Sequence, residues 1–170
     1  MANYIALLRA VNVGGTGKLA MTELVAMCEA AGFAKVKTYI ASGNVVFQSA
    51  KSEAKVKADL EARLASYAGK PVGVMVRTAT EMAAVLAANP FPDKAPNRTV
   101  AIFLDDAPPK NAAAEARHLK DEEIAPGKRE IYVHYGDGMA DSKLVIPAAK
   151  AGTMRNMNTV AKLAAMAAAL

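Results

Sequence analysis

The sequence contains no tryptophan, one cysteine and two histidines among its 170 residues. The single cysteine, Cys28, excludes an intrachain disulfide, and its place among apolar helix positions favours a buried structural thiol over a nucleophile. His118 and His134 are expected to be structural or to face solvent. The sequence therefore predicts no metal site, and it offers no cofactor-binding motif.

Long apolar runs and a dominant charge are absent as well. No run approaches the roughly 18 apolar residues of a membrane span, and we expect no secretion signal and a cytoplasmic protein without a membrane partner. The net charge is only +5, but residues 1–100 hold twelve Lys and Arg against seven Asp and Glu. This basic first half suits an anionic partner, although a mixed, solvated surface is the simpler explanation.

The first half shows a clear order of strand and helix patterns. Apolar runs predict strands, spacings of three and four predict helices, and Ser52 and Gly69 are suited to cap the second helix. The expected elements are a strand over 3–13, a helix over 22–31, strands over 35–40 and 45–49, a helix over 53–68 whose buried stripe is Val56, Leu60, Leu64 and Tyr67, and a strand over 71–78. This order is typical of a split βαβ, or ferredoxin-like, unit.

The second half follows a less regular version of the same pattern. Thr78 and Glu81 form a capping box before a helix over 80–89. Beyond it we expect a strand over 98–106, a strand with a turn behind it over 129–139, helices over 108–119 and 158–169, and no last strand. The run at 120–123 is interpreted as an exposed helix end. The predicted fold class is α+β with two ferredoxin-like halves, mostly antiparallel sheets and helices packed on one face, divided into domains 1–78 and 79–170.

A glycine cluster in residues 9–24, RAVNVGGTGKLAMTEL, resembles a nucleotide-binding loop. In the phosphate-binding loop of nucleotide hydrolases, Gly17 and Lys18 would fit the core, but Asn12 stands where a glycine is required and Leu19 where a hydroxyl is required. The dinucleotide fingerprint lacks the acidic residue expected after the second strand. Neither motif is predicted.

Polar groups at the end of the first strand still need an explanation. An arginine within an apolar strand is costly to bury, so Arg9 and Asn12 should face a polar cleft. Gly14 and Gly15 permit close backbone approach, and amides of the loop could point at an anion. The alternative is structural: Arg9 would form a salt bridge at a strand end, and Asn12 with the glycines would form a turn.

Four blocks of the sequence resemble one family when taken together. They are RAVNVGG with KLAMTEL, TYIASGNVVF, SKL at 142–144, and TMRNMNT at 153–159, with NPF at 89–91 between them. They are similar to a widespread, mainly bacterial family of uncharacterised cytoplasmic proteins, the domain of unknown function numbered 1697, whose members typically begin with R-G-I-N-V-G-G. The resemblance implies two ferredoxin-like halves and supplies no activity.

The resemblance also groups residues that are far apart in the sequence. This chain departs from the family pattern at Ala10, Val11 and Ala41, and Met157 replaces a usual tryptophan, which weakens any proposal of base stacking. The candidate ligand-binding residues are Arg9, Asn12, Gly14, Gly15, Lys18, Thr38, Ser42, Gly43, Asn44, Ser142, Lys143, Thr153, Arg155, Asn156, Asn158 and Thr159.

These residue types are suited to bind an oxyanion. Arginine, lysine, amide and hydroxyl groups donate hydrogen bonds to phosphate or carboxylate, and arginine does so with two parallel bonds. We therefore predict a cleft in which Arg9 and Arg155 clamp an anion and Lys143 adds charge. Nucleotides and nucleic acid are candidate ligands, by analogy with other ferredoxin-like sheets.

Two alternatives remain open at the level of sequence. No catalytic residue is identified, because the group contains no His, Cys, Asp or Glu that could act as a general base. An enzyme acting on a phosphorylated small metabolite would need a base elsewhere. A purely structural or oligomerising protein would use the same residues in turns and caps, with Asn158 or Thr159 as the N-cap of the last helix.

Overall fold

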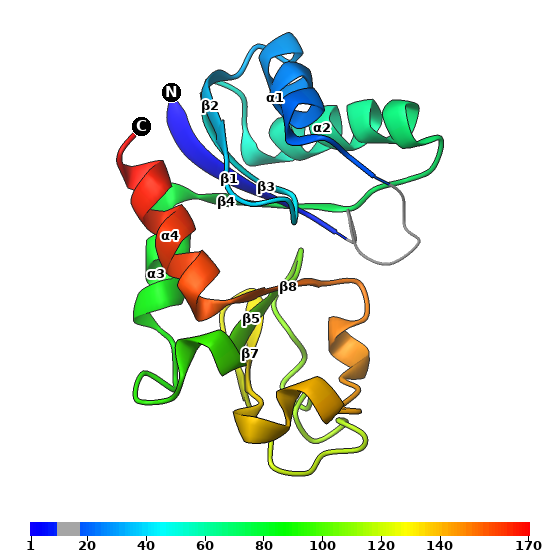
Figure 1. Ribbon diagram of the computed structural model, residues 1–170, viewed down its shortest axis with the longest axis vertical. Coiled ribbons are helices and arrows are strands. Elements are labelled where there is room, and N and C mark those ends of the chain that lie inside the picture. Colours follow the sequence, from blue (N-terminus) through cyan, green and yellow to red (C-terminus); the bar gives the residue numbers. More distant parts are fainter. Residues whose placement is uncertain (10–17) are drawn as a thin grey trace. The chain divides into compact units, whose positions relative to one another are not determined.

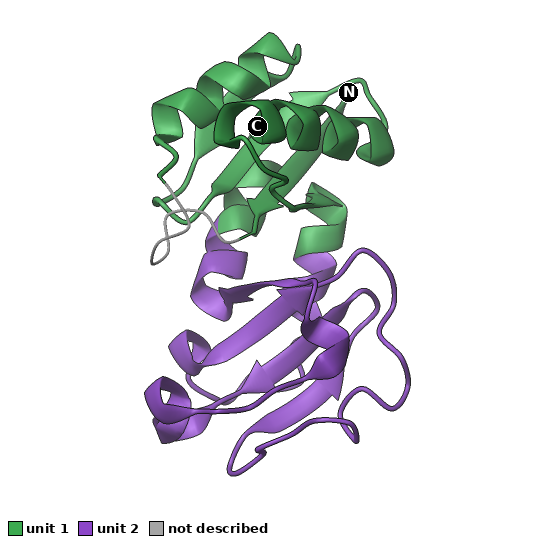
Figure 2. Cartoon of the chain, turned by 90° about the vertical axis from the view of Figure 1, so that its right-hand side faces the viewer, with its two compact units in different colours: residues 1–82, 163–170 green, residues 83–162 purple. Residues whose placement is uncertain are grey.

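The computed structural model describes residues 1–9 and 18–170. The chain divides into two compact units: unit 1 is Met1–Met82 with Leu163–Leu170, and unit 2 is Ala83–Lys162 (Figure 2). Each unit contains a four-stranded antiparallel sheet. The predicted α+β class with two ferredoxin-like halves is confirmed, while the predicted domain bounds at 78 and 79 stay a prediction.

Unit 1 has the strand order β2-β3-β1-β4. Each pair of neighbouring strands is antiparallel, as the split βαβ pattern requires. Along the chain the elements are β1 (Ala2–Leu8), α1 (Met21–Ala30), β2 (Ala34–Thr38), β3 (Asn44–Ser49), α2 (Glu53–Ala68) and β4 (Val74–Thr78). The part of the predicted first strand beyond residue 9 lies outside the described residues.

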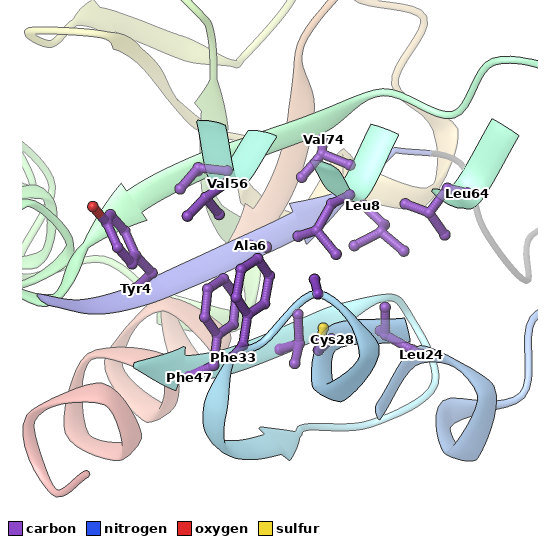
Figure 3. Packing of buried hydrophobic residues seen from close by; sticks show 14 of the residues in the cluster. Tyr4, Ala6, Leu8, Leu24, Cys28, Phe33, Phe47, Val56, Leu64 and Val74 are labelled. Atoms are coloured by element: carbon purple, nitrogen blue, oxygen red, sulfur yellow. The ribbon is translucent and has the colours of Figure 1, made fainter. Parts of the chain in front are cut away.

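Helices α1 and α2 cover one face of this sheet (Figure 1). Because side chains alternate along a strand, Tyr4, Ala6 and Leu8 of β1 all point toward the helices. Figure 3 shows Phe33 and Phe47 side by side in this core, and their rings are stacked with centroids 4.3 Å apart. On the opposite face, Asn3 Nδ2 donates to the carbonyl of Ala167 in α4 (Met157–Ala168) at 2.8 Å.

The helix ends of unit 1 form as their sequence predicts. Ser52 Oγ accepts from the backbone N–H of Lys55 at 3.3 Å, and Gly69 ends α2 in the left-handed conformation, with φ of 72°. Cys28 is fully buried in α1, as expected. Tyr67 was expected in the buried stripe of α2, but 48% of it is exposed, because it lies in the last turn, beyond the buried Leu64.

Unit 2 repeats the strand order of unit 1. Its sheet is ordered β6-β7-β5-β8, with every neighbouring pair antiparallel. After α3 (Ala79–Ala87) come η1 (Pro96–Arg98), β5 (Thr99–Phe103), β6 (Glu123–Pro126), β7 (Glu130–His134), η2 (Gly136–Asp141), η3 (Pro147–Ala149), β8 (Thr153–Asn156) and α4 (Met157–Ala168). The strand expected to be missing is therefore present as β8.

In unit 2 one predicted helix is wrong and one predicted strand is confirmed. Residues 108–119 form turns instead of a helix, and the backbone of Arg117 pairs with Val145 in an isolated β-bridge. This extended pairing prevents helical hydrogen bonds at the end of the segment. The strand with a turn behind it that was predicted over 129–139 is present: β7 ends at His134, and Gly136 behind it takes a left-handed conformation with φ of 65°.

The run at 120–123 is not a helix end. Glu122 is buried, and its carboxylate accepts hydrogen bonds from Ser142 Oγ and from the backbone N–H of Lys120. Strand β6 begins at the next residue, Glu123. Glu122 therefore ties the segment of Ser142 to the start of β6. The sequence does not show this role, because Glu122 stands within a run of charged residues that is typical of a solvated surface.

Candidate functional site

The end of β1 lies beside the turn between β2 and β3. The backbone N–H of Leu8 donates to the carbonyl of Gly43 at 2.8 Å, and that of Arg9 donates to the carbonyl of Gly73 at 2.9 Å. Thr38 ends β2 and pairs with Val45 at the start of β3. One end of the unit 1 sheet thus gathers Arg9, Thr38 and the Ser42–Asn44 turn.

The Ser42–Asn44 turn also has a structural role of its own. Asn44 is fully buried, and its Nδ2 donates to the carbonyl of Tyr39 at 3.0 Å and to Ser42 Oγ at 2.8 Å. The carbonyl of Asn44 accepts from the backbone N–H of Tyr39 at 3.0 Å. Gly43 has φ of 83°, a conformation that other residues rarely adopt. These bonds close the hairpin without a ligand.

The remaining unit 1 candidates lie between β1 and α1 in the sequence. Asn12, Gly14 and Gly15 lie outside the described residues. Lys18 is exposed, and Leu19 beside it is buried in the unit 1 core. The side chain of Lys18 therefore faces solvent, while the burial of Leu19 holds the backbone beside it in place.

In unit 2, Arg155 is the most constrained cation among the candidates. It lies on β8 opposite Ala101 of β5, and its Nη1 donates to Thr153 Oγ1 and to the carbonyl of Met154, both at 2.9 Å. Burial lowers the pKa of the guanidinium to about 10. Both of these acceptors belong to β8, so they hold the guanidinium along its own strand.

Three candidate residues at the start of α4, Asn156, Asn158 and Thr159, have different surroundings. Asn156 Oδ1 accepts from the backbone N–H of Thr159 at 2.9 Å, so Asn156 is the N-cap. The expected caps were Asn158 or Thr159; that expectation is wrong because α4 begins one residue earlier, at Met157. Asn158 is exposed and Thr159 is buried. Asn158 is therefore the candidate of this turn that faces solvent.

Ser142 and Lys143 lie in a different part of unit 2. Ser142 Oγ donates to the carboxylate of Glu122 and accepts from the backbone N–H of Leu144 at 3.3 Å. The hydroxyl of Ser142 lowers the pKa of Glu122. Lys143 is exposed. Ser142 thus ties its segment to the start of β6, whereas Lys143 can contribute charge.

A pocket in unit 2 was not predicted by the sequence. Its volume is about 660 Å³, and its walls come from β5, β8 and the segment between residues 144 and 152. We call it the β8 pocket; its main lining residues are Ile102, Arg117, Tyr135, Val145, Lys150 and Met154. Met154 lies opposite Ile102, so it points to the face of β8 opposite to Arg155. Its lining residues come from separate segments and form no motif, so the sequence gives no signal for this pocket.

His134 ends β7 opposite Thr99 of β5. His134 is buried, and its Nδ1 shares a hydrogen bond of 3.0 Å with Thr99 Oγ1. Within residues 1–9 and 18–170, no three His, Cys, Asp or Glu side chains are grouped so that they could hold a metal ion. In the same part of the chain, no helix is long and apolar enough to cross a membrane.

Comparison with known proteins gives a family and a close fold. The family model described as "Protein of unknown function (DUF1697)" matches residues 1–132. The structure of the conserved bacterial protein SP0830 from Streptococcus pneumoniae is similar over 98% of both chains, with 27% sequence identity and a TM-score of 0.79. No curated protein matches the chain. Since the family model covers well over half of its residues, the chain belongs to the DUF1697 family.

Proposed function

We propose that the chain binds a phosphate- or carboxylate-bearing ligand, and that Arg155 is its principal cation in unit 2. The observation that carries the proposal is the setting of this guanidinium, which is half-buried and held by Thr153 Oγ1 and the Met154 carbonyl. An anionic group placed there gains a charge-assisted contact with the guanidinium, and partial burial of this side chain strengthens the contact.

Two further features support this proposal. Arg155 precedes a helix start, where partial positive charge favours anions, and the exposed amide of Asn158 lies in that first turn. In unit 1, Arg9 follows β1 beside the Ser42–Asn44 turn. Arg9 is the candidate anion-binding cation of unit 1, and nucleotides and nucleic acid remain candidate ligands.

A thermal-shift titration with inorganic phosphate, nucleotides and short single-stranded oligonucleotides tests the proposal. A ligand at 100 times its Kd adds about 2.7 kcal/mol to the free energy of unfolding. For a chain of this size that raises Tm by roughly 5–10 °C. No stabilisation by any of these anions at millimolar concentration overturns the proposal. Affinity for strands that falls steeply with salt identifies nucleic acid as the ligand.

Charge-changing variants then locate the site. Arg155→Gln and Arg9→Gln should each weaken binding of the anion that stabilises the wild type, whereas Lys110→Gln, which removes one exposed charge elsewhere, should not. Asn158→Asp adds a carboxylate at an exposed position, so it should weaken anion binding while the helix start tolerates it well. Wild-type affinity in the variants of Arg155, Arg9 and Asn158 contradicts the assignment. Unfolding of both arginine variants favours a structural role for these residues.

An enzyme acting on a phosphorylated metabolite is the alternative use of the same contacts. The described residues of the candidate group include no carboxylate, imidazole or thiol that could act as a base. Turnover of a bound phosphorylated compound by the wild type, abolished in Arg155→Gln, would favour this alternative.

A further inference from the structure

We infer that the β8 pocket binds a small amphipathic carboxylate, a molecule with an apolar body and a single anionic end. This site goes beyond the proposed anion site, because the two differ in residues and in the face of β8 that they use. The argument rests on the shape of the pocket, the exposure of apolar side chains in its wall, and the sign of its charges.

The size and lining of the β8 pocket suit a small molecule. Its volume of about 660 Å³ lies within the range of small-molecule sites in proteins. Ile102 of β5 forms part of its wall with Leu144 and Ile146, all of which belong to the unit 2 core. The wall is therefore continuous with a packed core rather than formed by surface loops alone.

Apolar surface is left in contact with water at this pocket. Val145 is 46% exposed and Met154 is 43% exposed, although both are large hydrophobic residues. They reach the pocket from two segments, the residues before η3 and strand β8. Covering them with an apolar ligand removes this surface from water, which supplies the favourable free energy of binding.

The backbone around the pocket is fixed in two places. Arg117 and Val145 exchange both backbone hydrogen bonds, with N–O distances of 2.8 Å and 3.0 Å. At Gly152 the chain lies so close to β5 that an added Cβ would meet Ile102 Cγ2 and the carbonyl of Phe103 at 2.8 Å. The wall is therefore preformed, and a ligand need not order it.

The charges of the lining select an anion. The ionic residues that line the pocket are Arg117 and Lys150, both exposed cations, and no acidic residue lines it. Tyr135 adds a phenol, and burial raises its pKa, so it stays neutral and able to donate a hydrogen bond at physiological pH. An apolar body with one carboxylate satisfies both parts of this lining, whereas an inorganic anion leaves the apolar wall uncovered.

Isothermal titration of the full chain with decanoate, decanol and acetate separates the two contributions. Decanoate should bind at one site with a submillimolar Kd. Decanol should bind about tenfold more weakly for lack of the charge, and acetate should give no measurable heat. Equal binding of decanol and decanoate, or no saturable binding of decanoate at millimolar concentration, overturns the inference.

Variants assign the binding to the β8 pocket. Arg117→Gln combined with Lys150→Gln should raise the Kd for decanoate about tenfold. Met154→Glu, at an exposed position, should abolish the binding by placing a like charge beside the carboxylate. Lys128→Gln, an exposed charge on the turn before β7, should leave the Kd unchanged.

If Met154→Glu binds decanoate as the wild type does, the ligand lies elsewhere and the inference fails. Circular dichroism of each variant checks that it is folded. Met154→Lys is a second test with the opposite charge, and it should retain or strengthen decanoate binding. A weaker affinity of Met154→Lys contradicts the charge argument. Phosphate titrations report on the proposed anion site instead, so failure of one site is distinguishable from failure of the other.

Discussion

Replacing Asn44 by alanine should destabilise unit 1. The side chain is fully buried, and its Nδ2 donates to the Tyr39 carbonyl and to Ser42 Oγ. Each neutral hydrogen bond contributes about 1 kcal/mol net, and an acceptor left without its donor in a buried setting adds to the cost. We therefore expect Asn44→Ala to lower the free energy of unfolding by about 2–3 kcal/mol. For a chain of this length Tm should fall by roughly 5–10 °C.

Urea unfolding followed by circular dichroism measures this loss, and a double-mutant cycle tests its origin. Ser42→Ala removes one acceptor of the Asn44 amide and should cost about 1 kcal/mol. Because the two side chains contact each other, the double variant should be less destabilised than the sum of the single variants by about 0.5–1 kcal/mol. Additive effects would show that the bond between Ser42 and Asn44 contributes nothing.

A change of less than about 0.5 kcal/mol in Asn44→Ala would refute the structural reasoning, since losses that small are typical of surface substitutions. If the same variant then lost affinity for phosphate, Asn44 would be a ligand contact rather than a hairpin lock. A matched substitution at an exposed polar position, Asn158→Ala, should be close to neutral for stability.

Three further measurements test the cap of α4, the burial of Cys28 and the burial of Tyr132. Asn156→Ala removes the N-cap of α4 and should cost about 1 kcal/mol in urea unfolding. Native Cys28 should resist a thiol-specific disulfide reagent at pH 8 and react only after unfolding, because burial raises its pKa to about 12. Burial also raises the pKa of Tyr132 to about 12, so the native state retains a proton that the unfolded state loses above pH 10. Stability should therefore fall between pH 10 and 12, and the fall should be smaller in Tyr132→Phe.

Each of these predictions has an outcome that contradicts it. If Asn158→Ala lowers the free energy of unfolding as much as Asn156→Ala does, Asn156 is not the residue that caps α4. Stoichiometric labelling of Cys28 within seconds in the folded protein would show that the thiol is accessible. An unchanged slope in Tyr132→Phe would assign the alkaline loss of stability to another group, of which Cys28 is the first to test.

Local signals explain why the fold of unit 1 could be predicted from the sequence. Helix α2 is bounded by a serine cap and a left-handed glycine, Ser52 and Gly69. The capping box of α3 also forms, since Thr78 Oγ1 accepts from the backbone N–H of Glu81 and the Glu81 carboxylate accepts from that of Thr78. Such signals act within one helical turn, so they do not depend on how distant segments pack.

Pairing between distant segments explains what could not be predicted in unit 2. Strands β6 and β8 have four residues each, too few for a clear alternation of polar and apolar positions. The residues of 108–119 carry a helical pattern, yet the pairing of Arg117 with Val145 holds their end extended. These elements form because β5 and β7 provide edges for them, which a single segment of sequence does not reveal.

The candidate site shows a further reason why residue types alone do not settle a function. A buried asparagine that closes a turn and an asparagine that binds a ligand use the same hydrogen-bonding groups, so Asn44 and Asn156 fit either role by sequence. The structure separates them from Asn158 by exposure and by bonds to the backbone. A charge placed at Asn158 therefore tests ligand binding with little effect on the fold. Truncation of Asn44 or Asn156 tests the fold first, and the difference between the two responses shows which positions serve binding.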